Sequence, residues 1–237
     1  MAFLTPFGGA ATPDETTMFW FPAVGALIGI AVGGVWWLAA KVWGANAAAA
    51  VALVTDLALT GLLHVDGLAD AADGLLAPMS RDRRLRAMAD PAVGAFGVAG
   101  VAGVLLLRFG ALASVRPLPL AVCGLWCASR TSMVIVTEVL PYARPDGLVK
   151  EFLATGERRG SRRALLVATL VLGVVVSGVL LAFGRGLRGV VALGGEMIAM
   201  GAVAALARRR IGGFTGDVLG AAGVVGETVG LLIVATR

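Results

Sequence analysis

Seven long apolar stretches divide this sequence of 237 residues, and no other feature limits its possible folds so strongly. The stretches lie near residues 18–40, 45–63, 92–115, 117–140, 164–183, 187–207 and 216–235. A helix needs about 20 apolar residues to cross the hydrocarbon core of a bilayer, so each stretch is long enough for one span. The sequence therefore predicts an all-α, polytopic membrane helix bundle with about seven transmembrane helices, folded as one domain over residues 1–237.

The composition excludes the other broad classes of protein. Charged residues make up 15% of the chain and hydrophobic residues 58%, whereas soluble domains carry about 25% charged residues. The same two values exclude a disordered chain, which needs low hydrophobicity and high charge. Cys123 and Cys127 stand four residues apart in an apolar stretch without a nearby His, so we interpret them as packing residues rather than zinc ligands.

Basic residues are unevenly divided between the two sides of such a bundle. The connections 64–91, 141–163 and 208–215 share one side and hold thirteen of the 20 Lys and Arg residues. The positive-inside rule makes that side cytoplasmic. We therefore expect a cytoplasmic N-terminus, an external C-terminus and cytoplasmic catalytic loops. The net charge of +5 favours membrane lipids or an anionic substrate as partners. We expect no nucleic acid, and the oligomeric state stays open.

The segment HVDGLADAADG over residues 64–74 carries the densest chemical signal. If it is helical, Asp66, Asp70 and Asp73 stand at i, i+4 and i+7 and share one face. Oxygen ligands of this kind suit Mg²⁺ or Mn²⁺, and Mg²⁺ typically joins carboxylates to substrate phosphates. The alternative interpretation is a solvated acidic face of a helix.

Arginines follow this acidic segment directly. Arg81, Arg83 and Arg84 are able to hold phosphate oxygens through two parallel hydrogen bonds each. Carboxylates that bind metal beside such arginines indicate phosphoryl transfer. His64, the only histidine, is either a residue at a helix end or a base or substrate contact.

Two further aspartates stand where apolar stretches begin. Asp90 precedes Pro91, so it is either a helix cap or a further metal ligand. Asp217 follows the turn GGFTG over residues 212–216, which could offer backbone N–H groups to an anion. It is likewise either a cap or a metal ligand.

Several charged residues fall inside apolar stretches or near their ends: Asp56, Arg108, Arg130, Glu138, Glu196 and Glu227. The sequence assigns none of them a partner, because Arg130 and Glu138 are eight residues apart. Acids at such positions are typical of ion sites in transporters. A cation-coupled transporter is therefore one alternative to an enzyme.

The acidic segment resembles the signature H-L-D-G-L-A-D-x-x-D-G of the cobalamin synthase family, also called adenosylcobinamide-GDP ribazoletransferases, with Val65 in place of Leu. The segment SRDRRLRAMADPAVGAFG over residues 80–97 resembles the family's basic stretch, Met-x-Asp and Gly-x-x-Gly. Further resemblances cover Ser129-Arg130, Tyr142-Ala143-Arg144 with Gly147-Leu148, and GGFTGDVLGAA over residues 212–222. Pro91, Ala92 and Val224 depart from the family pattern, whereas Glu227 matches it.

This resemblance implies a Mg²⁺-dependent enzyme of the bacterial cytoplasmic (inner) membrane whose active face is cytoplasmic. The enzyme would transfer the adenosylcobinamide-phosphate group of adenosylcobinamide-GDP to α-ribazole or α-ribazole 5′-phosphate. The products would be adenosylcobalamin or its 5′-phosphate and GMP, in the last part of nucleotide-loop assembly. A second enzymatic alternative is a membrane alcohol phosphotransferase with an aspartate-rich metal site, whose motif D-G-x-x-A-R this segment does not match.

Given this resemblance, we expect roles for eleven residues. The expected metal ligands are Asp66, Asp70, Asp73, Asp90 and Asp217. The expected substrate contacts are Arg81, Arg83, Arg130, Arg144 and Thr215. The attacking hydroxyl gives its proton to His64 or to one carboxylate of the acidic segment.

Overall fold

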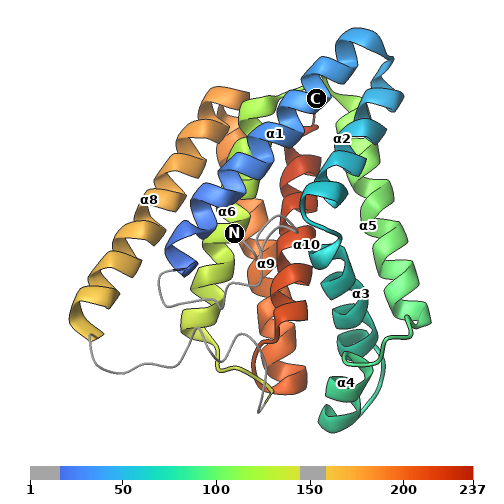
Figure 1. Cartoon of the computed structure of the whole chain (residues 1–237), viewed down its shortest axis with the longest axis vertical. Helices are drawn as coiled ribbons and strands as arrows, with labels where there is room; N and C mark the ends of the chain where they lie inside the picture. The colour runs from blue at the N-terminus through green and yellow to red at the C-terminus, as the bar shows by residue number, and fades with distance from the viewer. Residues whose placement is uncertain (1–16, 145–158, 237) are drawn as a thin grey trace.

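A computed structural model gives the structure of this chain and describes residues 17–144 and 159–236 (Figure 1). Apart from one isolated bridge between Tyr142 and Phe214, its regular elements are helical, so the predicted all-α class is confirmed. They are η1 (Thr17–Trp20), α1 (Phe21–Val42), α2 (Ala45–Leu59), α3 (Leu63–Leu76), α4 (Arg81–Ala87), α5 (Ala95–Ser114), α6 (Pro119–Val139), α8 (Arg159–Arg185), α9 (Leu187–Ile211) and α10 (Gly216–Val234).

Six described helices are long and apolar enough to cross a membrane by themselves: α1 with η1, α5, α6, α8, α9 and α10. The short helices α2 and α3 reach that length only together, and they meet at an angle of 87°. Counting this pair as one broken span gives seven, so the predicted number of about seven spans is confirmed.

The break between α2 and α3 differs from the single helix that we expected over residues 45–63. Gly61 and Leu62 have φ values of 58° and 62°, which is the left-handed region that ends a right-handed helix. The backbone then resumes as α3. The acidic segment, expected in a connection, therefore lies on the second helix of this bent pair.

Leu62→Gly is expected to raise the stability of the chain by about 1 kcal/mol, because an L-residue with a side chain pays roughly that cost in the left-handed region. Leu62 is 55% exposed, so the loss of its side chain costs little packing. The matched control is Leu63→Gly, one residue into α3, which should lower stability by about 0.5–1 kcal/mol. Thermal unfolding in detergent measures both, and equal shifts would contradict the prediction.

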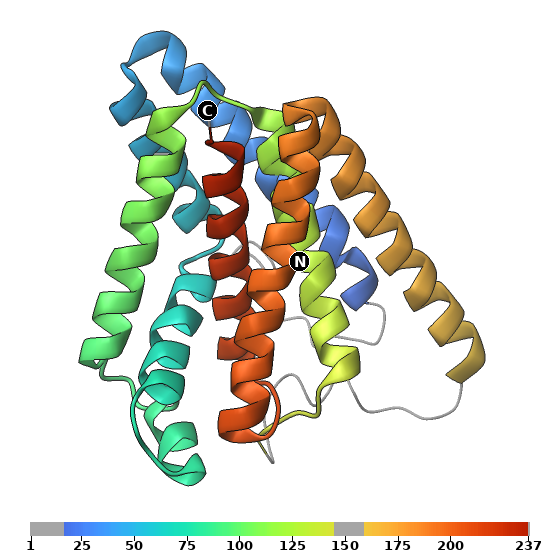
Figure 2. The same ribbon diagram turned by 180° about the vertical axis from the view of Figure 1, so that it is seen from behind.

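Helices α6 and α10 form the centre of the bundle. Over an apolar stretch of 18 residues in each helix, 89% of the residues are buried in α6 and 72% in α10. The share is only 22% in both α5 and α8. Figure 2 shows α10 in dark red between α9 and α3, with α5 on the outside. Helix α10 packs against α3, α5, α6 and α9, while α1 and α8 pack against α6. Residues of α10 can therefore meet residues from most other helices.

The polar connections gather at one end of the bundle. Figures 1 and 2 show α4, the start of α10 and the ends of α6 and α9 at the lower end. The turn between α1 and α2 and the linker between α5 and α6 lie at the upper end. We expected three connections, residues 64–91, 141–163 and 208–215, on one side of the membrane. Their described parts lie at the same end of the bundle. Lys150 and Arg158, which belong to that count, lie outside the described residues.

Candidate active site

Helices α3 and α10 approach each other closely, with a glycine on each helix at the contact. A Cβ atom at Gly67 would lie 3.0 Å from the carbonyl oxygen and 3.1 Å from the Cα of Asp217. A Cβ atom at Gly220 would lie 3.2 Å from the Cα of His64. Because the two backbones touch, the first turn of α10 lies directly against α3. Two residues separated by 150 positions, Gly67 and Asp217, are thereby neighbours.

Four carboxylates gather at this contact, namely Asp66, Asp70, Asp73 and Asp217, which we call the acidic cluster. The first three lie on α3, which is helical, so the spacing puts them on one face as predicted. Asp70 is half-buried, and the charges around it are the carboxylates of the other three and the guanidinium of Arg144. The cluster thus holds four acids and a single cation among these neighbours.

Arg144 is the cation of this cluster. Its Nη2 donates to Oδ2 of Asp217 at 2.9 Å and to the carbonyl oxygen of Met88 at 3.2 Å. Both side chains of the pair stay partly exposed, at 27% for Arg144 and 22% for Asp217. An ion pair that solvent reaches in this way contributes little stability. Its guanidinium also retains further N–H groups, which suit a bound anion.

A short backbone contact holds Arg144 in this place. The amide of Ala143 donates to the carbonyl oxygen of Phe214 at 2.8 Å, and the amide of Phe214 donates to that of Pro141 at 3.0 Å. The rings of Tyr142 and Phe214 stack edge to face with centroids 5.5 Å apart. Burial raises the pKa of the Tyr142 hydroxyl above its ordinary value, and this outweighs the opposite effect of Arg144.

The turn before α10 serves mainly to shape the backbone. Gly212 ends α9 with φ of 83°, and a Cβ at Gly213 would lie 2.0 Å from the carbonyl oxygen of Pro141. Thr215 is fully buried and caps α10, since its Oγ1 accepts from the amide of Val218 at 3.3 Å. The cap of α10 is therefore Thr215 and not Asp217, which leaves the Asp217 carboxylate in the acidic cluster.

Asp73 differs from the other members of the cluster because it also caps a helix. Its Oδ2 accepts from the amide of Gly94 at 2.7 Å and its Oδ1 from the amide of Gly97 at 2.9 Å. These are N–H groups of the first turn of α5, which have no partner within that helix. A helix cap was one of the two interpretations of Asp90, the other being a metal ligand. Its Oδ1 accepts from the amide of Ala92, ahead of α5, and its side chain is exposed.

The arginines after the acidic segment separate into different roles. Arg81 donates to the carbonyl oxygens of Ile211 at 2.8 Å and Ala143 at 3.2 Å, so it joins α4 to the base of α9. Arg84 is buried and donates to carbonyl oxygens at the end of α3. Arg83 is exposed, and within residues 17–144 and 159–236 no hydrogen bond or ion pair involves it. Arg83 is thus the one of these three that is free to meet a substrate.

Arg130 and His64 face the interior rather than the acidic cluster. Arg130 is 1% exposed and forms an ion pair with Glu227 of α10. His64 is 6% exposed, and the charged groups that act on it are Arg130 and Arg108. Two of the residues that we expected to act on substrate are therefore enclosed within the helix bundle.

The interior partners form a buried ion network of Asp56, Arg108, Arg130 and Glu227. Arg108 pairs with Oδ2 of Asp56 at 2.8 Å and with Glu227. The indole of Trp126 donates to Oδ1 of Asp56 at 2.7 Å. We had assigned Arg108 no role, although a charge inside an apolar span is itself a signal that a partner exists.

The acidic cluster has the donors of a site for a hard divalent cation. Its ligands are all carboxylate oxygens, and Mg²⁺ is usually bound by one or two carboxylates together with substrate phosphates. Within the described residues, no three His, Cys, Asp or Glu side chains converge closely enough to form a complete metal site as they stand. Asp73 is occupied in capping α5. The carboxylates that remain able to bind a metal ion are those of Asp66, Asp70 and Asp217.

Residues 3–235 match the family described as cobalamin-5-phosphate synthase. The chain belongs to this family. Its similarity to the adenosylcobinamide-GDP ribazoletransferase of Bradyrhizobium diazoefficiens is 38% identity over 218 residues, which cover 90% of this chain and 80% of that relative. The proteins of the same name from Chlorobium phaeobacteroides and Escherichia coli O157:H7 are 36% and 33% identical, over 90% of this chain and 85% and 84% of theirs. No solved structure matches the chain.

In this chain, the segment that carries the sequence resemblance lies on the helix α3 that bears the cluster. The second resembling segment, residues 212–222, provides the start of α10 and Asp217. The two segments are far apart in the sequence and in backbone contact in the fold.

Proposed function

We propose that the acidic cluster, with Arg144 and Arg83, is the active site of this chain. Membership of the cobalamin-5-phosphate synthase family and the similarity to named relatives give the activity. The chain is an adenosylcobinamide-GDP ribazoletransferase, a multi-pass membrane enzyme of cobalamin biosynthesis. The observation that supports the site is the contact of α10 with α3, which adds Asp217 and its partner Arg144 to three carboxylates.

The substrates are those that the relatives' name contains, adenosylcobinamide-GDP and α-ribazole or its 5′-phosphate. A ribose hydroxyl attacks the phosphorus attached to the cobinamide, a new P–O bond forms, and the bond to GMP breaks. The hydroxyl proton passes to a carboxylate of the cluster. His64 is enclosed in the interior, which leaves the carboxylates as the acceptors.

We propose Mg²⁺ as the cofactor, held by Asp66, Asp70 and Asp217. When bound, the ion neutralises diphosphate oxygens and stabilises the charge on the leaving GMP. Arg144 holds Asp217 in position and directs its remaining N–H groups toward phosphate oxygens. Arg83 is exposed on α4 and is proposed as a further contact for phosphate oxygens. Asp73 orients the start of α5, and Asp90, whose side chain is exposed, is a further candidate ligand.

The end of the bundle that bears this site is proposed to face the cytoplasm, in a bacterial inner membrane. The described arginines at that end support this orientation, since basic residues concentrate on the cytoplasmic side. Substrates made by soluble enzymes would then reach the site without crossing the bilayer.

The decisive experiment is GMP release by the purified, lipid-reconstituted protein given adenosylcobinamide-GDP and α-ribazole. We expect GMP and a cobalamin product to form at equal rates with Mg²⁺ and to fall to background with a chelator, because phosphate charge is then not neutralised. Repeating the assay with α-ribazole 5′-phosphate shows which acceptor is preferred. Full activity in the chelator would contradict the proposed cofactor.

A transporter gives a different result in the same vesicles. The transporter hypothesis predicts a cation-dependent flux without nucleotide release, in which buried acidic residues bind the cation. Asp56 and Glu227 are already paired with arginines, which leaves Glu196, whose two carboxylate oxygens have no hydrogen-bond partner. Flux without GMP release would therefore favour that alternative and identify Glu196 as the first residue to replace.

A further inference from the structure

A second candidate binding site lies at the end of the bundle opposite the acidic cluster. Its walls come from the end of α1, the linker between α5 and α6, the start of α6 and the end of α8. They enclose a pocket of about 430 Å³. The reaction proposed above makes no use of this end of the molecule.

The charges at this end are all positive among the residues that the structure describes. They are Lys41, Arg116, Arg185 and Arg188. The described carboxylates that are exposed or half-exposed lie instead on α3 and α4, before α5, at the end of α6 and at the start of α10. An anion that approached the upper end would therefore meet attraction without a competing acid.

Two of these four cations already donate hydrogen bonds to the protein backbone. Arg185 donates to the carbonyl oxygens of Val234 and Thr236, both at 3.0 Å, and Arg188 donates to that of Thr236 at 3.2 Å. They therefore satisfy carbonyl groups at the end of α10.

Of the other two cations, one is available to the pocket. Lys41 lies over the ring of Trp37 with its Nζ 3.3 Å from the centroid, so the indole already engages its charge. Arg116 is exposed, and in the described part of the chain it has no hydrogen bond or ion pair.

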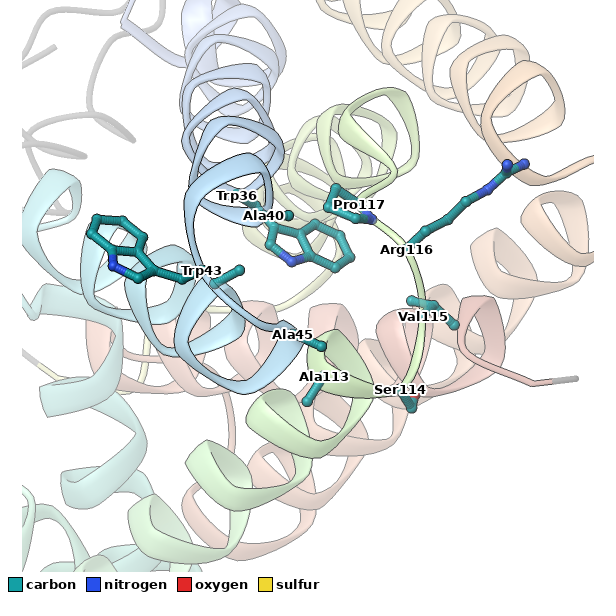
Figure 3. A pocket seen from close by; sticks show the side chains of 10 residues that line it. Trp36, Ala40, Trp43, Ala45, Ala113, Ser114, Val115, Arg116 and Pro117 are labelled. Carbon is teal, nitrogen blue, oxygen red and sulfur yellow. The ribbon is translucent and has the colours of Figure 1, made fainter.

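Figure 3 shows where Arg116 points. A neighbouring pocket of about 340 Å³ is lined by Trp36, Ala45 and Pro117 among others, and the indole of Trp36 covers its inner side. The guanidinium of Arg116 extends away from Trp36, toward the pale orange helices α8 and α9. Its charge is thus directed to the larger pocket, which Arg116 also lines.

The rest of the larger pocket is apolar and open. Trp37 is 47% exposed, Leu120 is 43% exposed and Phe183 is 81% exposed. Apolar walls of this kind do not favour the binding of a free phosphate, whereas an acyl chain gains binding free energy by burying its apolar surface against them. Exposed tryptophans together with cations are also the usual composition of a protein surface at the level of lipid headgroups.

We propose that this pocket binds one anionic phospholipid. The phosphate lies at the guanidinium of Arg116, the glycerol lies against Trp37, and an acyl chain follows Leu120 and Phe183 along the bundle. The site holds a lipid of the leaflet opposite the acidic cluster. It fastens the linker between α5 and α6 to the ends of α1 and α8.

Native mass spectrometry of the detergent-purified full chain tests this proposal by titration with phosphatidylglycerol and with phosphatidylcholine. The first phosphatidylglycerol should bind about five-fold more tightly, which is the effect expected of one basic residue close to anionic lipid. Arg116→Gln should remove this preference. Arg209→Gln, which removes an exposed arginine at the opposite end of the bundle, should retain it.

A second variant separates the headgroup from the acyl chain. Phe183→Ala should weaken the binding of both lipids and leave their ratio unchanged, since it removes apolar wall and no charge. Equal affinity for the two lipids in the wild-type protein would overturn the proposal. Displacement of phosphatidylglycerol by inorganic phosphate would also overturn it, because the site would then be one for a soluble anion.

Discussion

Asp70→Asn is expected to lower GMP release about 10²- to 10³-fold, the usual cost of losing one preorganised electrostatic contact in an active site. Asp70 is the member of the acidic cluster that the other three carboxylates surround. The amide keeps the size of the side chain but removes the charge that would bind Mg²⁺. The loss should therefore appear in the rate at saturating substrate.

The same substitution should leave the fold intact or stabilise it. Removing one of several like charges lessens their mutual repulsion, so the unfolding temperature without Mg²⁺ should stay equal to or exceed that of the wild-type protein. Mg²⁺ should raise the unfolding temperature of the wild-type protein, because a ligand that binds only the native state stabilises it. In Asp70→Asn this increase should be lost.

Asp82→Asn is the matched control for this prediction. Asp82 lies on α4, is exposed and is not among the charged groups that act on Asp70. We expect its activity and its response to Mg²⁺ to equal those of the wild-type protein. If Asp70→Asn retained full activity, the acidic cluster would be a solvated helix face and the active site would have to lie elsewhere.

The sequence predicted the part of this site that one helix carries. The spacing of Asp66, Asp70 and Asp73 is a local property, since residues four and three apart share a face of any helix. The helical state of residues 63–76 was therefore enough to bring their carboxylates together. The turn before residue 217 suggested Asp217 as a cap or a metal ligand, and the resemblance to the family suggested Arg144 as a substrate contact, but neither signal gave the residue a position in the fold.

Contacts between helices could not be predicted in the same way. Hydrophobic periodicity shows which face of a helix is buried, but not which neighbour covers it. The pairing of Arg130 with Glu227 joins residues 97 positions apart, and sequence reasoning had placed Arg130 at the substrate. The cap that Asp73 provides for α5 similarly joins two helices, whereas local rules pointed to Asp90.

The break between α2 and α3 at Leu62 could not be predicted from the sequence for a different reason. Leucine rarely adopts a positive φ, and it counts as an apolar residue in any hydropathy pattern. The stretch 45–63 therefore predicted one uninterrupted helix. Thr60 and Gly61 were the only local indications of a turn, and both residues are common in transmembrane helices.

Arg108→Met is expected to destabilise the protein by about 3–5 kcal/mol, the usual cost of removing one partner of a buried ion pair. Arg108 is 1% exposed and contacts Asp56, Glu227 and the hydroxyl of Thr228. Methionine fills a similar volume but leaves the Asp56 carboxylate without its cation. Thermal unfolding in detergent should show the loss, and the yield of monodisperse protein should fall with it.

Arg209→Met is the control, because it removes an exposed arginine from the last turn of α9. We expect its unfolding temperature to stay close to that of the wild-type protein, since no described hydrogen bond or ion pair is lost. An equal loss in both variants would show that the buried ion network contributes nothing specific to stability.

The double variant Asp56→Asn with Arg108→Met distinguishes loss of charge balance from loss of packing. Asparagine still accepts the hydrogen bond from Trp126, and Glu227 keeps Arg130. No unpaired carboxylate then remains at Asp56, so the double variant should be more stable than Arg108→Met alone. Residues in one ion network are expected to show such non-additive effects.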